Sequence, residues 1–136
     1  MKLIPYLYFP GNTEEAMNFY SEVFGGSITA LQRFSDGPTD MPVPEGFSNK
    51  IMHGRVGFGD CEIYFSDGHS VEGKSPHSMT IEFDDTETQN SVYARLSEGG
   101  KVHFELQDTF WGARFGKLAD KYGMNWDLNY QYPQKG

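Results

Sequence analysis

The chain has 136 residues and a formal net charge of −8, from 19 acidic and 11 basic residues, and it contains no run of Lys or Arg. This balance excludes functions that need a basic face, so we expect no nucleic-acid partner and no membrane partner. No apolar segment approaches the roughly 20 residues of a membrane span, and Met1 leads straight into a strand pattern rather than a signal peptide. The single cysteine, Cys61, cannot form an intrachain disulfide, and its strand pattern predicts a small buried side chain. We therefore expect a cytoplasmic protein.

The chain repeats one order of elements in its two halves. The first half contains an apolar strand, a helix-start signal, a helix and a glycine pair: Leu3 to Phe9, Asn12 with Thr13, Thr13 to Phe24, and Gly25-Gly26. The second half contains the same four features: Ser78 to Phe83, Asp85 with Thr86, Thr86 to Glu98, and Gly99-Gly100. Glu15 in the first helix and Gln89 in the second are placed to reach back to the helix start, as in a capping box.

Each half continues with three runs in which apolar residues alternate with a period of two. In the first half these are a strand carrying Ile28, Ala30, Gln32 and Phe34, and a hairpin of Ile51 to Phe58 with Cys61 to Asp67. In the second half they are a strand over Val102 to Leu106, and a hairpin of Ala113 to Ala119 with Met124 to Tyr130. This order predicts an α+β fold of two βαβββ modules in a pseudo-twofold arrangement, with a curved mixed sheet of about eight strands and a cleft between the modules.

We expect a single domain, with module one over residues 1–67, a linker over 68–76, module two over 77–130 and a tail over 131–136. Half of this chain is close to the lower limit for a stable core, so each module should need the other. The halves differ at Ser35 to Lys50, a segment that contains three prolines and two glycines. This composition predicts a long irregular loop, and lids over binding sites are a common use of such loops.

Three segments resemble the PhnB-like branch of the vicinal oxygen chelate superfamily, which also contains glyoxalase I, bleomycin- and fosfomycin-resistance proteins and extradiol dioxygenases. The segments read PYLYFPGNTEEAMNFYSEVFGG, IMHGRVGFGDCEIYFSD and TFWGARFGKLADKYGMNWDL, and the similarity covers essentially the whole chain. The resemblance implies the glyoxalase/bleomycin resistance/dihydroxybiphenyl dioxygenase fold. Members of the branch have been labelled as methyltransferases of ubiquinone synthesis. The chain contains nothing that resembles a Gly-rich loop for adenosylmethionine, so the sequence does not favour methyl transfer.

The resemblance also implies where a divalent metal would bind, with one ligand from the first strand and one from the fourth strand of each module. Pro5 falls on the first of these positions, and proline cannot ligate a metal. Tyr64 falls on the second, with Glu62 on the same face of the strand. His77 and Asp127 fall on the two positions of module two, and both can ligate. A zinc, nickel, manganese or iron site is therefore possible but incomplete, and no cofactor is firmly predicted.

Tyr64 and Glu62 are also pocket candidates, and the remaining candidates are pocket residues alone. His53 lies in the middle of a strand among apolar residues, where a neutral imidazole can serve as an acid, a base or a hydrogen-bond donor, or can be a satisfied core histidine. An aromatic cluster with one cation is formed by Phe110, Trp111 and Arg114. It can bind a planar or carboxylate-bearing ligand. Alternatively, Arg114 is a surface residue whose side chain covers Trp111. Trp126, next to Asp127, is a further pocket candidate.

Two functions from different classes remain open, and no catalytic residue is assigned in either. In the first, the chain binds a small molecule in the cleft between the modules without a complete metal site. In the second, it is a metal-dependent enzyme of the glyoxalase, dioxygenase or resistance type, with His77 and Asp127 as ligands and the others taken from Glu62, Tyr64 or a partner subunit. Pro5 favours the first.

Members of the superfamily commonly dimerise, and an aromatic-rich chain with two short modules has apolar surface to cover, so we predict a twofold-symmetric homodimer. Sedimentation velocity at micromolar concentration should show a species of twice the chain mass. A single species of 15.4 kDa would contradict this prediction.

Overall fold

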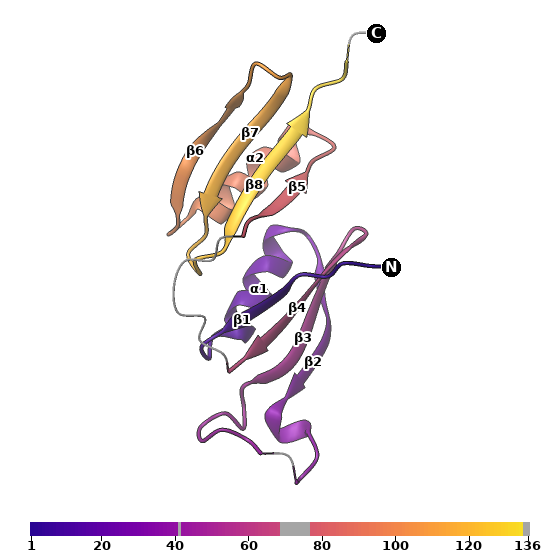
Figure 1. Ribbon diagram of the computed structural model, residues 1–136, viewed down its shortest axis with the longest axis vertical. Coiled ribbons are helices and arrows are strands. Elements are labelled where there is room, and N and C mark those ends of the chain that lie inside the picture. The colour runs from indigo at the N-terminus through magenta and orange to yellow at the C-terminus, as the bar shows by residue number, and fades with distance from the viewer. Residues whose placement is uncertain (41, 69–76, 135–136) are drawn as a thin grey trace. The chain divides into compact units, whose positions relative to one another are not determined.

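The computed structural model describes residues 1–40, 42–68 and 77–134, and it divides into two compact units, Met1–Glu72 and Gly73–Gly136. Most of the expected linker, His69 included, and the last two residues of the expected tail lie outside the described residues. Each unit is a βαβββ module, which confirms the fold predicted from the repeat (Figure 1). No helix among the described residues is long and apolar enough to cross a membrane.

The first unit consists of one sheet and one α-helix. Its elements are β1 Tyr6–Phe9, α1 Thr13–Val23, β2 Ser27–Arg33, a short 3₁₀ helix at Phe34–Asp36, β3 Ile51–Phe58 and β4 Cys61–Asp67. The strands lie in the order β1-β4-β3-β2, in which β1 and β4 are parallel and the other neighbours are antiparallel. The hairpin predicted across Gly59-Asp60 has the bounds expected from the sequence.

The second unit repeats this topology. Its elements are β5 Met79–Glu82, α2 Thr86–Ser97, β6 Lys101–Asp108, β7 Ala113–Ala119 and β8 Asn125–Gln131, and its strands lie in the order β5-β8-β7-β6. β5 and β8 are parallel, as β1 and β4 are. Among the described residues, the strands therefore form two four-stranded sheets. The prediction of one curved sheet of about eight strands was wrong in this respect.

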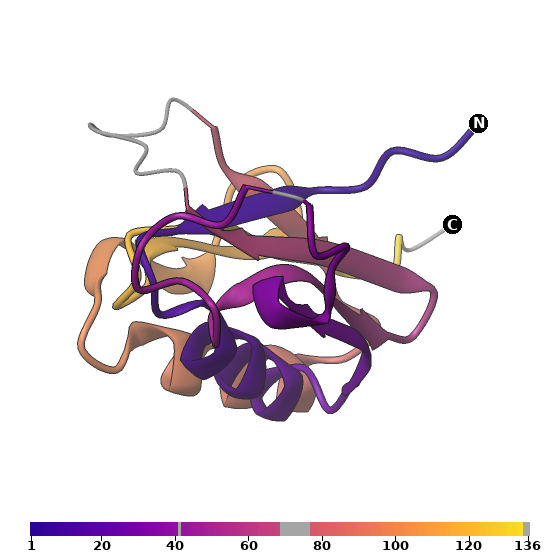
Figure 2. The same ribbon diagram turned by 90° about the horizontal axis from the view of Figure 1, so that it is seen from below.

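Helix α1 covers one face of its sheet because its apolar stripe packs against a small residue in the middle of β3. Met17 is fully buried, and a Cβ atom at Gly54 would lie 2.4 Å from the Met17 Cε, so a larger residue at position 54 would displace the end of the Met17 side chain. Val56, Ile63 and Phe65 are buried on the same face. Figures 1 and 2 both show α1 on one side of the sheet. The alternate residues of β1, β3 and β4 therefore lie on the face away from α1.

The N-terminus of helix α1 is capped by a buried carboxylate from β4 and not by the predicted cap residue. The Asn12 side chain makes no capping hydrogen bond. Instead, Asp67, which is 3% exposed, accepts hydrogen bonds from the backbone N–H groups of Thr13 and Ile51, with N···O distances of 3.1 and 2.8 Å. Asp67 can do this because the parallel register places it beside Phe9, at the end of β1 where the chain turns into the helix.

In the second unit the predicted cap is present and the predicted capping partner is not. Asp85 accepts a hydrogen bond from the Thr88 backbone N–H at 2.6 Å, as expected for an N-cap. Gln89 is fully buried, and its side chain bonds to Arg114 instead of reaching back to the helix start. Cys61 is exposed, contrary to its expected burial, because it begins β4 directly after the hairpin turn.

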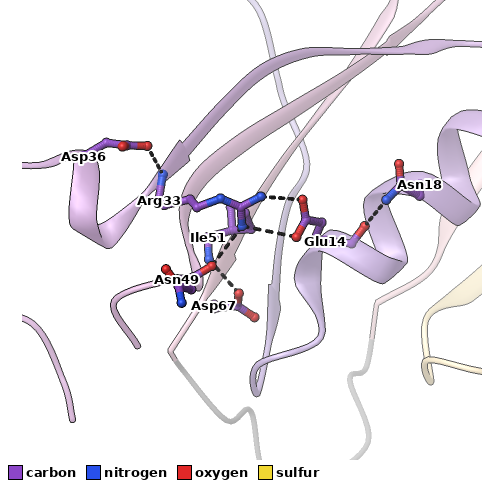
Figure 3. A network of polar contacts seen from close by, with 7 residues as sticks. All are labelled: Glu14, Asn18, Arg33, Asp36, Asn49, Ile51 and Asp67. Atoms are coloured by element: carbon purple, nitrogen blue, oxygen red, sulfur yellow. Dashed lines mark hydrogen bonds and ion pairs between the residues drawn. The ribbon is translucent and has the colours of Figure 1, made fainter. Parts of the chain in front are cut away.

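After the 3₁₀ helix at Phe34–Asp36, the described residues between β2 and β3 are irregular, as predicted, and Arg33 ties the base of this segment to the module (Figure 3). The Arg33 guanidinium bonds to both Glu14 carboxylate oxygens, at 2.7 and 3.1 Å, and to the Asn49 carbonyl at 2.9 Å. Asp36 accepts a hydrogen bond from the Arg33 backbone N–H. These contacts fix the two ends of the segment, and its role as a lid stays a prediction.

We predict that Asp67→Asn lowers the free energy of unfolding by about 1–3 kcal/mol. Asparagine offers one oxygen where two buried N–H groups need acceptors, so one donor is left without a partner. The same substitution at Asp85, an exposed N-cap where asparagine is as good as aspartate, should change stability by only a few tenths of a kcal/mol. Urea unfolding of the two variants measures the difference, and equal losses would contradict the role given to Asp67.

Candidate functional site

The face of the first sheet that lies away from α1 brings together polar and aromatic side chains from three strands. Tyr6 and Tyr8 come from β1, His53 and Arg55 from β3, and Tyr64 from β4. The register pairs Tyr64 with Tyr6 on one side and with Arg55 on the other. Of these five residues the sequence predicted His53 and Tyr64 as pocket candidates. We call the five together the tyrosine–arginine face.

A chain of two hydrogen bonds fixes the imidazole of His53 on this face. The Arg55 Nε–H donates to His53 Nε2 at 2.9 Å, and His53 Nδ1 lies 2.9 Å from the Tyr6 hydroxyl oxygen. A guanidinium can only donate, so Nε2 must be unprotonated, and the imidazole hydrogen must be on Nδ1. The Nδ1–H group therefore donates to the Tyr6 oxygen. Both nitrogens are occupied, which leaves no free lone pair on His53 for proton abstraction.

The surroundings of His53 and Tyr6 favour the neutral form of both side chains. Burial, and then the positive charge of Arg55, lower the pKa of His53, while Glu62 raises it to a smaller extent. Burial, and then Tyr8, raise the pKa of Tyr6, although Ser66 and Arg55 oppose this shift. At neutral pH the face therefore presents a neutral imidazole, a neutral phenol and one guanidinium charge.

Aromatic rings surround these polar groups. The Tyr6 and Tyr8 rings are stacked with centroids 4.8 Å apart, and the Tyr64 ring stands edge-on to Tyr6 at 5.7 Å. The Arg55 Cζ lies 4.5 Å from the Tyr64 ring centroid, within range of a cation–π interaction. The arginine is thus held by a ring on one side and by His53 on another, which keeps its head group in place.

The metal positions implied by the resemblance in module one carry poor ligands. Pro5 contributes only its backbone, whose carbonyl accepts a hydrogen bond from the Tyr64 N–H at 2.9 Å. Glu62, the nearest carboxylate on the same strand face, forms an ion pair with Lys2 at 3.1 Å. Tyr64 is thus part of the tyrosine–arginine face and Glu62 lies on the same strand, but the side-chain oxygens that they offer to a metal are a phenol oxygen and a carboxylate paired with Lys2.

In module two, His77 and Asp127 do line one hollow, of about 230 Å³, together with Ser78, His103, Lys117, Leu118 and Asn125. The Asp127 carboxylate already accepts a hydrogen bond from the Ser78 hydroxyl at 2.8 Å and lies 3.4 Å from the Lys117 Nζ. In residues 1–40, 42–68 and 77–134, no three His, Cys, Asp or Glu side chains gather closely enough to hold a metal ion.

The last predicted cluster is divided between the two faces of the second sheet. Arg114 points to the helix side, where its Nη1 donates to the Gln89 Oε1 at 3.1 Å. Trp126 is 2% exposed, and its Nε1–H donates to the buried Asp120 carboxylate at 2.8 Å. Trp111 and Phe110 are exposed, with Trp111 against the Phe115 ring. The arginine and the exposed aromatic residues therefore do not form one site.

Sequence reasoning missed three members of the tyrosine–arginine face, and a signal for each was present. Tyr6 and Tyr8 alternate with a period of two in the first strand, which places both on one face. Arg55 follows His53 by two residues in β3 and therefore shares its face. The polar residues at alternate positions of these strands are the ones that would indicate a ligand face.

We predict that the stability conferred by His53 is lost on mild acidification. The folded-state pKa of His53 is lowered, so as the pH falls the unfolded chain binds a proton at this residue first. The free energy of unfolding is then fully retained above about pH 6.5 and declines as the pH falls from there towards the folded-state pKa. His53→Gln should flatten this part of the profile of melting temperature against pH, whereas His103→Gln, on exposed β6, should keep it. Parallel profiles for wild type and His53→Gln would contradict the account.

Comparison with solved structures supports one family. The chain is similar to the protein PA1353 of Pseudomonas aeruginosa, with 34% identity, a TM-score of 0.84, and coverage of 96% of this chain and 98% of that one. It is also similar to the PhnB protein of Bacillus cereus, with 25% identity, a TM-score of 0.78, and coverage of 96% and 99%.

A more distant likeness shows the fold alone. The fosfomycin resistance protein FosX of Listeria monocytogenes is 11% identical, with a TM-score of 0.69 and coverage of 97% of this chain and 94% of that one. A second FosX structure is a complex with Mn(II) and a sulfate ion.

Residues 1–129 match the family model described as 3-demethylubiquinone-9 3-methyltransferase. The chain therefore belongs to this PhnB-like family.

Proposed function

We propose that the protein binds a small organic molecule on the tyrosine–arginine face and that it does so without a complete metal site. The observation that carries this proposal is the chain of hydrogen bonds from Arg55 through His53 to Tyr6, set among exposed aromatic rings. Ligand sites commonly combine apolar and aromatic side chains with a few polar groups in fixed positions. An imidazole with both nitrogens engaged is suited to orienting its neighbours rather than to moving a proton.

The chemistry of the donor set supports a metal-free site. A catalytic metal of this type needs three or four protein ligands with open positions for the substrate. Pro5 supplies no side-chain donor, Glu62 is paired with Lys2, and Asp127 is engaged by Ser78 and Lys117. The residues present therefore do not fit the metal centre that the superfamily implies, and we derive no reaction step through one.

A metal-dependent enzyme of the glyoxalase, dioxygenase or resistance type is the second candidate. The observation in its favour is that His77 and Asp127 line the same hollow, and FosX, which shares the fold, has been found with Mn(II). In this reading the missing ligands come from Glu62 or from a partner subunit. The cleft between the modules, the homodimer and the cytoplasmic location also stay predictions.

Methyl transfer, which the family description names, is not proposed for this chain. The segments between the first strand and first helix of each module are Pro10 to Asn12 and Phe83 to Asp85. Between them they contain one glycine, Gly11, and neither resembles a Gly-rich loop for adenosylmethionine.

The proposal is tested with ¹⁵N-labelled protein that has been treated with a chelator. A library of small organic fragments is screened by ¹H–¹⁵N correlation spectra, and melting temperatures are recorded with added Zn²⁺, Ni²⁺, Mn²⁺ or Fe²⁺. We expect fragments that shift the amides of β1, β3 and β4, and metals that raise the melting temperature little, because two ligands leave most of the binding free energy unrealised.

His77→Ala and Asp127→Ala serve as the matched variants and should change the response to metal only slightly. A stoichiometric submicromolar metal site that disappears in both variants would contradict the metal-free reading and support the enzyme. A fragment library that shifts no amide of the tyrosine–arginine face would contradict the proposed ligand site.

A further inference from the structure

The guanidinium of Arg55 has donors that the fold does not use. Its Nε–H is bonded to His53, and its flat face lies against the Tyr64 ring. Across the part of the chain that the structure describes, its two terminal nitrogens have no hydrogen bond and no ion pair, and the residue is only partly buried. An arginine that is fixed at Nε and along one face presents its outer nitrogens as a rigid fork, the arrangement that suits carboxylate oxygens.

Tyr6 supplies a second donor beside this fork. Because the His53 Nδ1–H donates to the Tyr6 oxygen, the hydroxyl hydrogen of Tyr6 must be directed away from the imidazole. Tyr6 is 38% exposed, so a ligand can compete with the neighbouring Ser66 hydroxyl for this hydrogen. Arg55 therefore acts on Tyr6 through His53: it sets the tautomer, and the tautomer sets the hydroxyl as a donor. An oxygen that only accepts, such as a carboxylate or phenolate oxygen, satisfies both groups.

Flat apolar area adjoins these donors. The Tyr6 and Tyr8 rings are nearly parallel, with an angle of 9° between their planes, and each is more than one-third exposed. A planar ligand can stack there while its charged end reaches the fork. The carboxylate of Glu62, on β4 beside this face, is occupied by Lys2, which removes an internal competitor for the guanidinium.

We propose that the tyrosine–arginine face recognises a planar organic anion, an aromatic carboxylate or phenolate, with its charged oxygen between the Arg55 fork and the Tyr6 hydroxyl. This inference rests on the proposed function and narrows it to one class of ligand. The overall charge of −8 opposes anion binding in general, so the local geometry must supply the affinity. His53 is a positioning residue in this arrangement.

The test uses three probes of similar size at pH 7.5: benzoate, its neutral isostere benzamide, and cyclohexanecarboxylate, an anion that is not planar. Each is titrated into the ¹⁵N-labelled full chain and followed by amide shifts in β1, β3 and β4. We expect benzoate to bind with a dissociation constant in the millimolar range, at least about tenfold lower than that of benzamide, which corresponds to about 1.4 kcal/mol. Cyclohexanecarboxylate should bind more weakly than benzoate.

Variants assign the effect to the residues. Arg55→Gln should weaken benzoate binding at least about tenfold, while Arg95→Gln, the same charge change on α2, should leave it unchanged. Tyr6→Phe keeps the ring and removes the hydroxyl, so it should also weaken benzoate binding, and it keeps the test decisive if Arg55→Gln does not fold.

Equal affinities for benzoate and benzamide, or equal affinities of Arg55→Gln and Arg95→Gln for benzoate, would overturn the anion class and leave the proposed ligand site standing. Benzoate that shifts no amide of this face at concentrations up to about 20 mM would overturn the inference as well. The fragment screen then decides separately whether the face binds small molecules at all.

Discussion

The first module depends on the two hydrogen bonds that the Asp67 carboxylate accepts. The carboxylate is almost fully buried, and it accepts hydrogen bonds from the first residue of α1 and the first residue of β3. One side chain at the end of β4 thereby joins the start of the helix to two strands of the sheet. A buried charge is tolerated only when such partners are present, so the contact fixes where the helix begins and which face of the sheet it covers.

The tyrosine–arginine face follows from that constraint. With α1 packed over Gly54, the alternate residues of β1, β3 and β4 are directed to the other side of the sheet, where they are polar or aromatic rather than aliphatic. The same alternation that builds the core thus builds the ligand face. Within the face, Arg55 determines the state of His53, and His53 determines the state of Tyr6. The fold thus determines the direction of the Tyr6 hydroxyl hydrogen through Arg55 and His53.

Sequence patterns predicted the parts of the fold that depend on local signals. The repeated strand–helix order, the Asp85 cap and the bounds of the hairpin at Gly59-Asp60 were all predicted correctly. The cap of α1 could not be predicted, because Asp67 is 54 residues from Thr13 in the chain and acts through the parallel pairing of β1 with β4. Periodicity within a segment carries no information about such a partner.

The candidate site was predictable only in part for a similar reason. Alternation identified His53 as a residue of interest, but a single strand does not show which residue engages its nitrogens. Arg114 was grouped with Trp111 because they are close in sequence, whereas the strand places Arg114 on the helix side, where the buried Gln89 holds it. The predicted metal ligands His77 and Asp127 do line one hollow, yet the partners of Asp127 come from different strands and are not visible in its own segment.

The central claim is that Arg55 holds His53 as a neutral imidazole with its hydrogen on Nδ1. Long-range ¹H–¹⁵N correlation spectra of the histidine rings report this state directly, with the signals assigned by comparison with His53→Gln. At pH 7.5 the account predicts a protonated Nδ1 and an unprotonated Nε2 for His53, and loss of this preference in Arg55→Gln. An imidazolium, or a neutral ring with its hydrogen on Nε2, would contradict the account.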